Sequence, residues 1–168
     1  MTTVVMDITR IEALHLRNLV AQFVDLLDQG DGQDPALARL TPDAYPDDVE
    51  ASREFRGLTR ADLLRRRTDD AGALLADLAA AGDVTDPASL DPEDALTEIV
   101  IVLDADRSAA WLRTLAALRL VLASRLGVVV EDDRPADDPR FGIYDWLGYR
   151  LDGLVRAVDE AVDGSAAS

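Results

Sequence analysis

The sequence contains no cysteine, no lysine and only one histidine, and these absences exclude several kinds of chemistry. Without cysteine there is no thiol nucleophile, no thiolate metal site and no disulfide. Without lysine there is no Schiff base and no P-loop lysine. A single histidine cannot form a histidine-pair metal site. The remaining residues indicate no particular reaction, so we expect no cofactor and favour a protein without enzymatic activity.

Basic residues are scarce beside acidic ones. The 17 arginines oppose 33 aspartates and glutamates, which gives a net charge of −16 and a pI near 4.2. Phosphate binding depends on clustered basic side chains, so this charge disfavours nucleic acid and anionic membranes as partners and favours basic proteins. No apolar run approaches the roughly 20 residues of a membrane span, and the first residues do not resemble a secretory signal. We therefore expect a cytoplasmic protein.

The length of 168 residues and the 48% of hydrophobic residues suit one domain with its own core. Aromatic residues make up only 5%, so the core should consist mostly of leucine, valine and alanine. We predict a single domain over 1–168, with an ordered core over 3–163 and a frayed tail over 164–168.

Hydrophobic periodicity predicts a mainly α fold, a bundle of about five helices with a minor two-stranded β element. Thr9 and Glu12 form a capping-box pattern, which should start a helix near residue 10 that ends near residue 29. The segments 3–6 and 98–103 are short and rich in β-branched residues, and we expect them to pair. We expect the 105–126 helix, which is apolar most of the way round, to be central. Further helices are predicted over 35–40, 47–57, 59–81 and 140–162.

Arginines concentrate between residues 53 and 67, where six of them face only Glu54 and Asp62 as opposing charges. This patch could bind an anion or an acidic partner through guanidinium groups. The alternative is helical ion pairing with flanking aspartates. The candidate binding residues are Arg53, Arg56 and Arg60.

Two other arginines, Arg119 and Arg125, lie on the predicted central helix, which has little polar surface. Each should be partly buried and should therefore need a carboxylate partner. We predict a buried ion-pair network with partners among Glu54, Asp145 and Asp104, which would link the middle and last helices. A ligand carboxylate in their place is the alternative.

Four aromatic residues lie within 141–149 at the start of the last helix. The apolar stripe of that helix, which we expect to face the core, is Ile143, Leu147, Leu151, Leu154 and Val158. Aromatic side chains that the core does not use are candidates for contact with a partner protein. The alternative is a second core face. The candidate contact residues are Tyr144, Trp146 and Tyr149.

Three segments, 39–63, 118–128 and 144–158, carry a combination of short motifs. The motifs are Pro-x-Ala-Tyr (42–45) before Glu-Phe-Arg-x-x-Thr (54–59), Leu-Arg-Leu (118–120) before Arg-Leu-Gly (125–127), and Asp-Trp-Leu (145–147). In order and spacing they resemble the actinobacterial family of domain of unknown function 2017, over about 3–160. The family has no assigned activity to transfer. Its members commonly lie beside the adaptor of the Clp protease in actinobacterial genomes, which implies a role near regulated proteolysis.

The leading hypothesis is therefore a non-enzymatic cytoplasmic interaction protein, which contacts partners through the 53–67 arginines and the 141–149 aromatics. The partner implied by the resemblance is the adaptor machinery of proteolysis, and a homodimer stays open. One alternative is a small-molecule, anion- or metal-binding regulatory domain that uses Arg119 and Arg125. A further alternative is a metal-dependent hydrolase that uses paired aspartates and glutamates.

Overall fold

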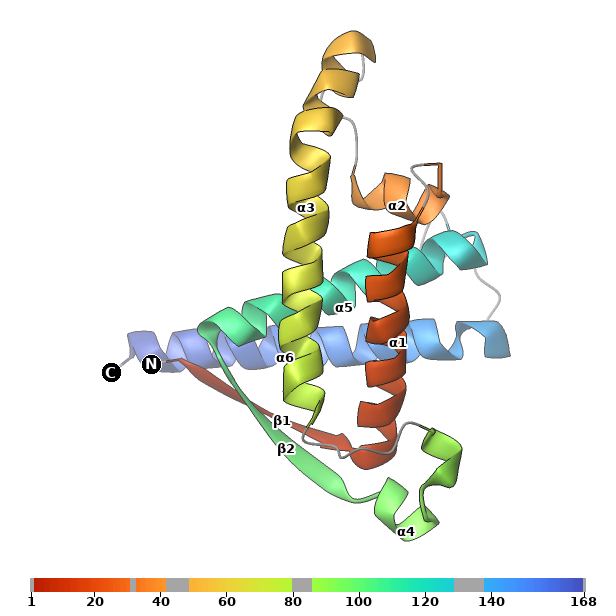
Figure 1. Cartoon of the computed structure of the whole chain (residues 1–168). Coiled ribbons are helices and arrows are strands. Elements are labelled where there is room, and N and C mark those ends of the chain that lie inside the picture. The colour runs from red at the N-terminus through yellow and green to blue at the C-terminus, as the bar shows by residue number, and fades with distance from the viewer. Residues whose placement is uncertain (1, 31–32, 42–48, 80–85, 129–137, 168) are drawn as a thin grey trace.

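The computed structural model describes residues 2–30, 33–41, 49–79, 86–128 and 138–167, without the side chains of 49–59 and 87. It has the predicted mainly α architecture with a minor β element (Figure 1). The elements in chain order are β1 (Thr3–Thr9), α1 (Arg10–Gln29), α2 (Pro35–Leu40), α3 (Val49–Leu78), a 3-10 turn (Pro87–Ser89), α4 (Pro92–Ala95), β2 (Glu98–Asp104), α5 (Ala105–Leu126), a second 3-10 turn (Pro139–Phe141) and α6 (Gly142–Ala166).

The two strands form an antiparallel ribbon, which confirms the predicted pairing of the two β-branched segments. Thr3 lies opposite Asp104 and Thr9 lies opposite Glu98, so β1 is three residues longer than expected. Successive side chains of a strand point to opposite faces. One face is buried against the helices through Val4, Ile8, Ile101 and Leu103.

Helix α1 begins as predicted, because Thr9 and Glu12 form the capping box. The backbone N–H of Glu12 donates to the Thr9 hydroxyl, and the Glu12 carboxylate accepts from the backbone N–H of Thr9. The buried face of the helix consists of Ala13, Leu14, Leu16, Val20, Phe23 and Leu27.

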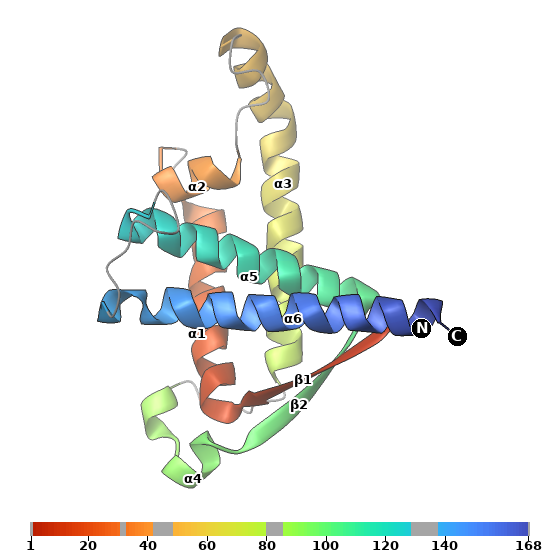
Figure 2. The same ribbon diagram turned by 180° about the vertical axis from the view of Figure 1, so that it is seen from behind.

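Helix α5 is central, as expected, and packs against α2, α3 and α6. Figure 2 shows α5 and α6 running alongside each other, with α1 and α3 crossing them. The Asp104 carboxylate caps the start of α5 by accepting from the backbone N–H of Arg107 at 2.8 Å. Gly127 ends the helix with a φ of 74°, a left-handed conformation that glycine adopts without strain.

Helix α3 is continuous from Val49 to Leu78, so the predicted break at Gly57 between two helices is wrong. A glycine inside a helix costs only about 1 kcal/mol relative to alanine, which does not by itself end a helix. The second half of α3 is held by packing, with Leu74 and Leu78 fully buried. The end of α3 is also joined to α5, because the indole N–H of Trp111 donates to Asp77.

The last helix also differs from its predicted bounds. A 3-10 turn precedes α6, which starts at Gly142 and continues to Ala166, three residues beyond the predicted end of the ordered core at 163. In the part of the chain that the structure describes, no helix is both long and apolar enough to cross a membrane.

Candidate functional site

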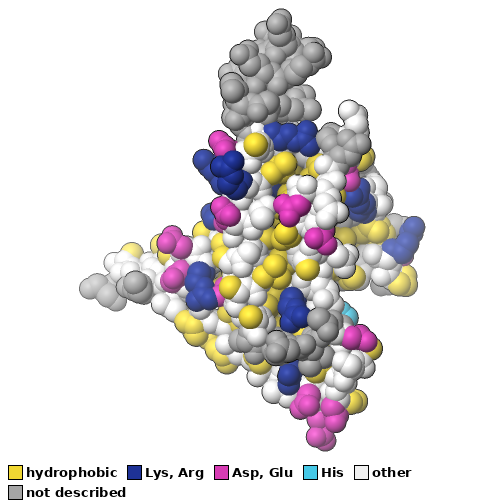
Figure 3. All heavy atoms as spheres, in the orientation of Figure 1, with side chains coloured by type: hydrophobic (Ala, Val, Ile, Leu, Met, Phe, Trp, Pro, Cys, Tyr) yellow, Lys and Arg dark blue, Asp and Glu magenta, His cyan; other side chains and the backbone are white. Residues whose placement is uncertain are grey.

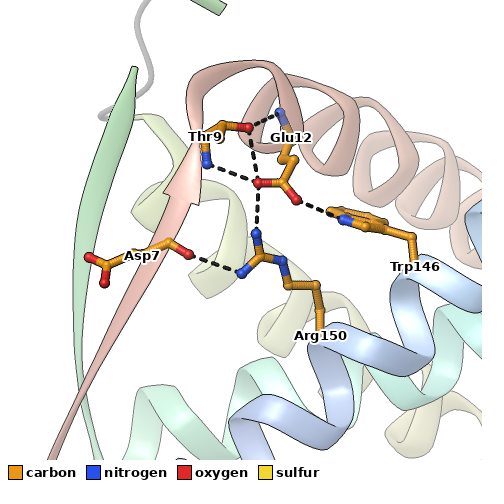
Figure 4. Close-up of polar contacts among 5 residues, drawn as sticks. All are labelled: Asp7, Thr9, Glu12, Trp146 and Arg150. Carbon is orange, nitrogen blue, oxygen red and sulfur yellow. Dashed lines mark hydrogen bonds and ion pairs between the residues drawn. The ribbon is translucent and has the colours of Figure 1, made fainter. Parts of the chain in front are cut away.

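A cluster of polar side chains joins β1, α1 and α6 around the carboxylate of Glu12 (Figure 4). The carboxylate accepts from the backbone N–H and the hydroxyl of Thr9, at 3.0 and 2.9 Å. It also accepts from the indole N–H of Trp146 at 2.9 Å and from Nη2 of Arg150 at 2.6 Å. The second terminal nitrogen of Arg150 donates to the backbone carbonyl of Asp7 at 3.0 Å. One carboxylate thus connects the strand, the first helix and the last helix.

These contacts decide the charge state of Glu12. Burial by itself raises the pKa of the carboxyl, but the hydrogen bonds from Arg150, Thr9 and Trp146 outweigh it and lower the pKa to about 2. A general acid or base needs a pKa near the working pH. Glu12 is therefore a fixed negative charge that orients its donors, and its low pKa does not suit proton transfer at neutral pH.

Beside this cluster lies a groove of about 550 Å³ between α1 and the start of α6. Its apolar residues are Leu19, the half-buried Trp146 and Ile143, whose residue surface is 51% exposed. The single histidine, His15, is exposed at the groove and is visible at the surface in Figure 3. The other lining residues are Glu12, Asn18, Gln22 and Gly142. The groove thus combines an apolar wall with polar side chains.

The structure separates the three aromatic residues that we predicted to form one contact surface. Tyr144 is buried: the Phe141 ring lies edge-on to it at 6.5 Å, and the Arg119 guanidinium carbon lies 4.1 Å from its ring centroid. Trp146 lines the groove, and Tyr149 is 73% exposed elsewhere on α6. Tyr144 is therefore a core residue and not a surface contact.

The predicted core stripe of α6 holds at Leu147 and Leu154, which are buried, but fails at Ile143. In the first turn of the helix Tyr144 takes the buried position, so Ile143 turns into the groove. Helical spacing predicted which residues could share a face. It did not predict which neighbouring position faces α5 at the end of the helix.

The structure describes the side chains of only part of the arginine patch over 53–67. Arg53, Glu54 and Arg56 lie outside the residues whose side chains are described, and Arg60 is half-buried. Further along α3, Arg66 and Arg67 line a hollow of about 660 Å³ with residues of α5 and Leu40.

Within this hollow Arg67 is poorly satisfied. One terminal nitrogen donates to the carbonyl of Leu40 at 3.4 Å, and its buried Nε has no hydrogen-bond partner. Burial lowers the pKa of Arg67, although the nearby Asp70 acts in the opposite direction. Asp70 itself binds Arg113 through two bonds of 2.7 and 2.8 Å. The hollow therefore contains a half-buried guanidinium, and the neighbouring carboxylate of Asp70 is already paired with Arg113.

The predicted buried ion-pair network is wrong for Arg125. Its side chain is 47% exposed and binds Asp34 through two hydrogen bonds of 2.9 and 2.8 Å. Asp34 also caps α2 by accepting from the backbone N–H of Ala36. The pairing raises the pKa of Arg125 and lowers that of Asp34. Asp104, one of the expected partners, caps α5 instead.

Arg119 is half-buried, as expected, and stacks on Tyr144. Asp145, another expected partner, is exposed on α6. Across the residues that the structure describes, no group of three or more histidine, aspartate or glutamate side chains could hold a metal ion.

Sequence reasoning found Trp146 but missed its partners. Glu12 was recognised only as a capping residue, and Arg150 was not considered. The two lie 138 positions apart, so no local pattern connects them.

Comparison with known proteins gives one match. Neither a search of curated proteins nor a search of solved structures found a similar protein. The family model described as "Domain of unknown function (DUF2017)" matches residues 2–158, which agrees with the resemblance of the motifs. Since this match spans most of the 168 residues, the chain belongs to the DUF2017 family.

Proposed function

We propose that this chain is a non-enzymatic cytoplasmic protein that binds a partner protein in the groove between α1 and α6. The observation that carries the proposal is the placement of Trp146. Its indole N–H is satisfied by Glu12 at 2.9 Å, so the ring offers apolar surface to the groove without an unpaired donor. A preoriented aromatic side chain loses little entropy on binding, and such residues often dominate interface energies.

The surroundings of Trp146 support a protein segment as the occupant. Ile143 lies on the same groove with about half of its surface exposed, although a large aliphatic residue favours burial. The polar side chains of His15, Asn18 and Gln22 lie around these apolar groups. An apolar centre with a polar rim is the usual composition of a protein interface. The groove therefore suits one or two apolar side chains of a partner.

The choice of partner rests on charge and on the family. The net charge of −16 favours a basic partner surface. The gene neighbourhood of the family makes the adaptor of the Clp protease the first partner to test, which would place the protein in regulated proteolysis.

The test compares two substitutions on the same helix. Ile143→Asp puts a charge into the groove, whereas Val162→Asp puts the same charge at a position that is 52% exposed and does not line the groove. Each full-length variant is titrated calorimetrically against the purified Clp adaptor, and the tagged chains are also used to capture partners from the native lysate. We expect Ile143→Asp to weaken binding by at least about tenfold and Val162→Asp to leave it unchanged. A partner that binds both variants as well as the unsubstituted chain would overturn the assignment of the groove.

A second candidate function is the binding of a small anion in the hollow between α3 and α5. It is favoured by one observation, the buried Nε of Arg67 without a hydrogen-bond partner. A phosphate or carboxylate there would satisfy this donor and neutralise a half-buried charge.

Thermal unfolding in inorganic phosphate, against chloride at equal ionic strength, tests this candidate. The Arg67→Ala variant should lose any stabilisation by phosphate. Arg65→Ala, which removes an exposed arginine that pairs with Asp62 at 3.4 Å, should keep it. Equal melting temperatures in phosphate and chloride for the unsubstituted chain would exclude phosphate as the ligand.

A further inference from the structure

The β ribbon exposes three valines on the face that points away from the core. Val5, Val100 and Val102 are 60%, 61% and 52% exposed, and Val5 lies directly opposite Val102. In Figure 3 hydrophobic side chains reach the surface along the margin where Figure 1 places this ribbon. An exposed apolar face does not identify its partner, so the inference depends on the edge of the ribbon and on its charges.

The two edges of the ribbon differ. On β1 the Asp7 carbonyl accepts from Arg150 of α6, so it points away from β2. In an antiparallel pair the residue opposite then also directs its backbone N–H and C=O outward. That residue is Val100, and Val102 follows it two positions later with the same orientation.

In the part of the chain that the structure describes, the outer edge of β2 is open, because no residue outside the ribbon forms a hydrogen bond with the backbone of Val100 or Val102. The half of β2 next to α4 lies at the outer margin of the molecule in both ribbon views (Figures 1 and 2). An open, apolar edge strand is a template on which another strand can pair.

We propose that the outer edge of β2 binds an extended segment of another protein, which adds as a third, antiparallel strand and carries basic residues on either side of an apolar centre. The charges of the strand define this partner. Glu98 and Asp104 are exposed at the two ends of β2 and lie on the same face as Val100 and Val102. A partner strand with arginine or lysine at positions six residues apart would place one cation opposite each carboxylate.

A second copy of this chain fits the edge poorly. An antiparallel pairing of two β2 strands centred on Ile101 would place each Glu98 opposite the Asp104 of the other copy. Like charges directly opposite each other on neighbouring strands are destabilising. The two chains, each with a net charge of −16, would also repel each other. Charge complementarity therefore favours a basic partner strand over self-association.

This surface is separate from the groove between α1 and α6, so the proposal does not depend on binding in the groove. Strand addition obtains its affinity from main-chain hydrogen bonds and its specificity from alternate side chains. Here the bonds would come from Val100 and Val102, and the specificity from the two terminal carboxylates with the valines between them.

Two synthetic peptides test the charge requirement on the full-length chain. The first, Arg-Thr-Val-Thr-Val-Thr-Arg, places its valines and both arginines on the face of Val100, Val102 and the carboxylates. The second has glutamate in place of both arginines. Fluorescence anisotropy should show at least about tenfold tighter binding of the arginine peptide, with an affinity that falls as salt is added. Glu98→Arg should reduce this preference at least about threefold. Equal binding of the two peptides, or no binding of either, would overturn the proposal.

A second pair of variants tests the strand edge. Val100→Pro removes the outward N–H of the edge, a change that edge strands tolerate because this N–H does not bond to β1. Val100→Thr keeps the N–H and the preference for a strand. We expect the proline variant to bind the arginine peptide at least about tenfold more weakly than the unsubstituted chain, and the threonine variant to keep the original affinity. Circular dichroism checks that both variants are folded.

Two outcomes of this second experiment would contradict the proposal. If the proline variant folds and still binds the peptide as the threonine variant does, the peptide does not add to β2. If sedimentation shows that the unsubstituted chain is a dimer that Val100→Pro dissociates, the occupant of the edge is a second copy of this chain and not a basic partner.

Discussion

Gly148 of α6 lies against the guanidinium of Arg119 of α5, so closely that a Cβ atom at position 148 would be 3.0 Å from the Arg119 Nε. The same Cβ would be 3.1 Å from the Cζ and from one terminal nitrogen. The Arg119 Cζ also lies 4.1 Å from the ring centroid of Tyr144. The contact between the two long helices at this point thus depends on the absence of a side chain at position 148.

Alanine substitutions at two glycines of α6 distinguish the effect of this contact on stability from the effect of helix propensity. Gly153 has open space around its Cβ position, so Gly153→Ala should stabilise the fold by about 0.5–1 kcal/mol. Gly148→Ala brings the same increase in helix propensity but displaces Arg119. It should therefore stabilise the fold less than Gly153→Ala, or destabilise it. Urea unfolding measures both. Equal stabilisation by the two substitutions would show that Arg119 moves aside without cost.

Asp77 accepts a hydrogen bond from the Trp111 indole at 2.7 Å and also contacts Arg107. Trp111 is buried, so Asp77→Ala would leave its N–H without a partner in the core and should cost about 1–3 kcal/mol. Asp62→Ala removes a carboxylate from a pair with Arg65 in which the aspartate and arginine side chains are 61% and 69% exposed, and it should cost less than about 1 kcal/mol. Denaturant unfolding of both variants checks the order, and a larger loss for Asp62→Ala would contradict it.

The low pKa of Glu12 predicts a pH dependence of stability. The pKa is about 2 in the folded chain, against an ordinary value of 4.5. A carboxyl with a lowered pKa stabilises the fold fully above its ordinary pKa, and this contribution is lost as the pH falls towards the folded value. The difference in the free energy of unfolding between the unsubstituted chain and Glu12→Gln should therefore be constant from pH 7 to about 5.5 and should shrink below about pH 4.5. Urea unfolding at pH 7 and pH 3.5 measures it. An equal difference at the two pH values would mean that Glu12 is not held as an anion.

Arg150 connects α6 to both α1 and β1, through Glu12 and the Asp7 carbonyl. Its side chain is only 22% exposed, so Arg150→Ala removes charge-assisted hydrogen bonds that are partly shielded from solvent. We expect the free energy of unfolding to fall by about 1.5–3 kcal/mol. Arg156→Ala is the matched control, because Arg156 is exposed on the same helix. Its melting temperature should stay at that of the unsubstituted chain. Equal melting temperatures for the two variants would show that the Glu12 cluster does not hold α6 in place.

The predictions that succeeded rest on interactions within a few residues. The capping box of Thr9 and Glu12, the helix over 35–40 and the end of the central helix at residue 126 each depend on neighbours along the chain. The pairing of the two β-branched segments was also predictable, since both have an apolar face that needs burial. Composition directly gives the net charge of −16 and the lack of cysteine and lysine.

Where local signals conflict with packing, the sequence was misleading. Gly57 looks like a helix end, yet α3 continues through it. Ile143 looks like a core residue, yet it is exposed and Tyr144 is buried in its place. In each case several local arrangements have similar free energies, and contacts with distant elements select among them.

By itself the sequence determined the helical class, the ribbon, the cap of α1 and the strongly acidic charge, because these follow from neighbouring residues and from composition. Only the tertiary structure decided which charges meet. Arg125 pairs with Asp34 across 91 positions, and Glu12 receives Trp146 and Arg150 from the far end of the chain. With 33 acidic residues available to 17 arginines, charge and spacing allow many pairings, and the packing of the helices against α5 selects the few that form.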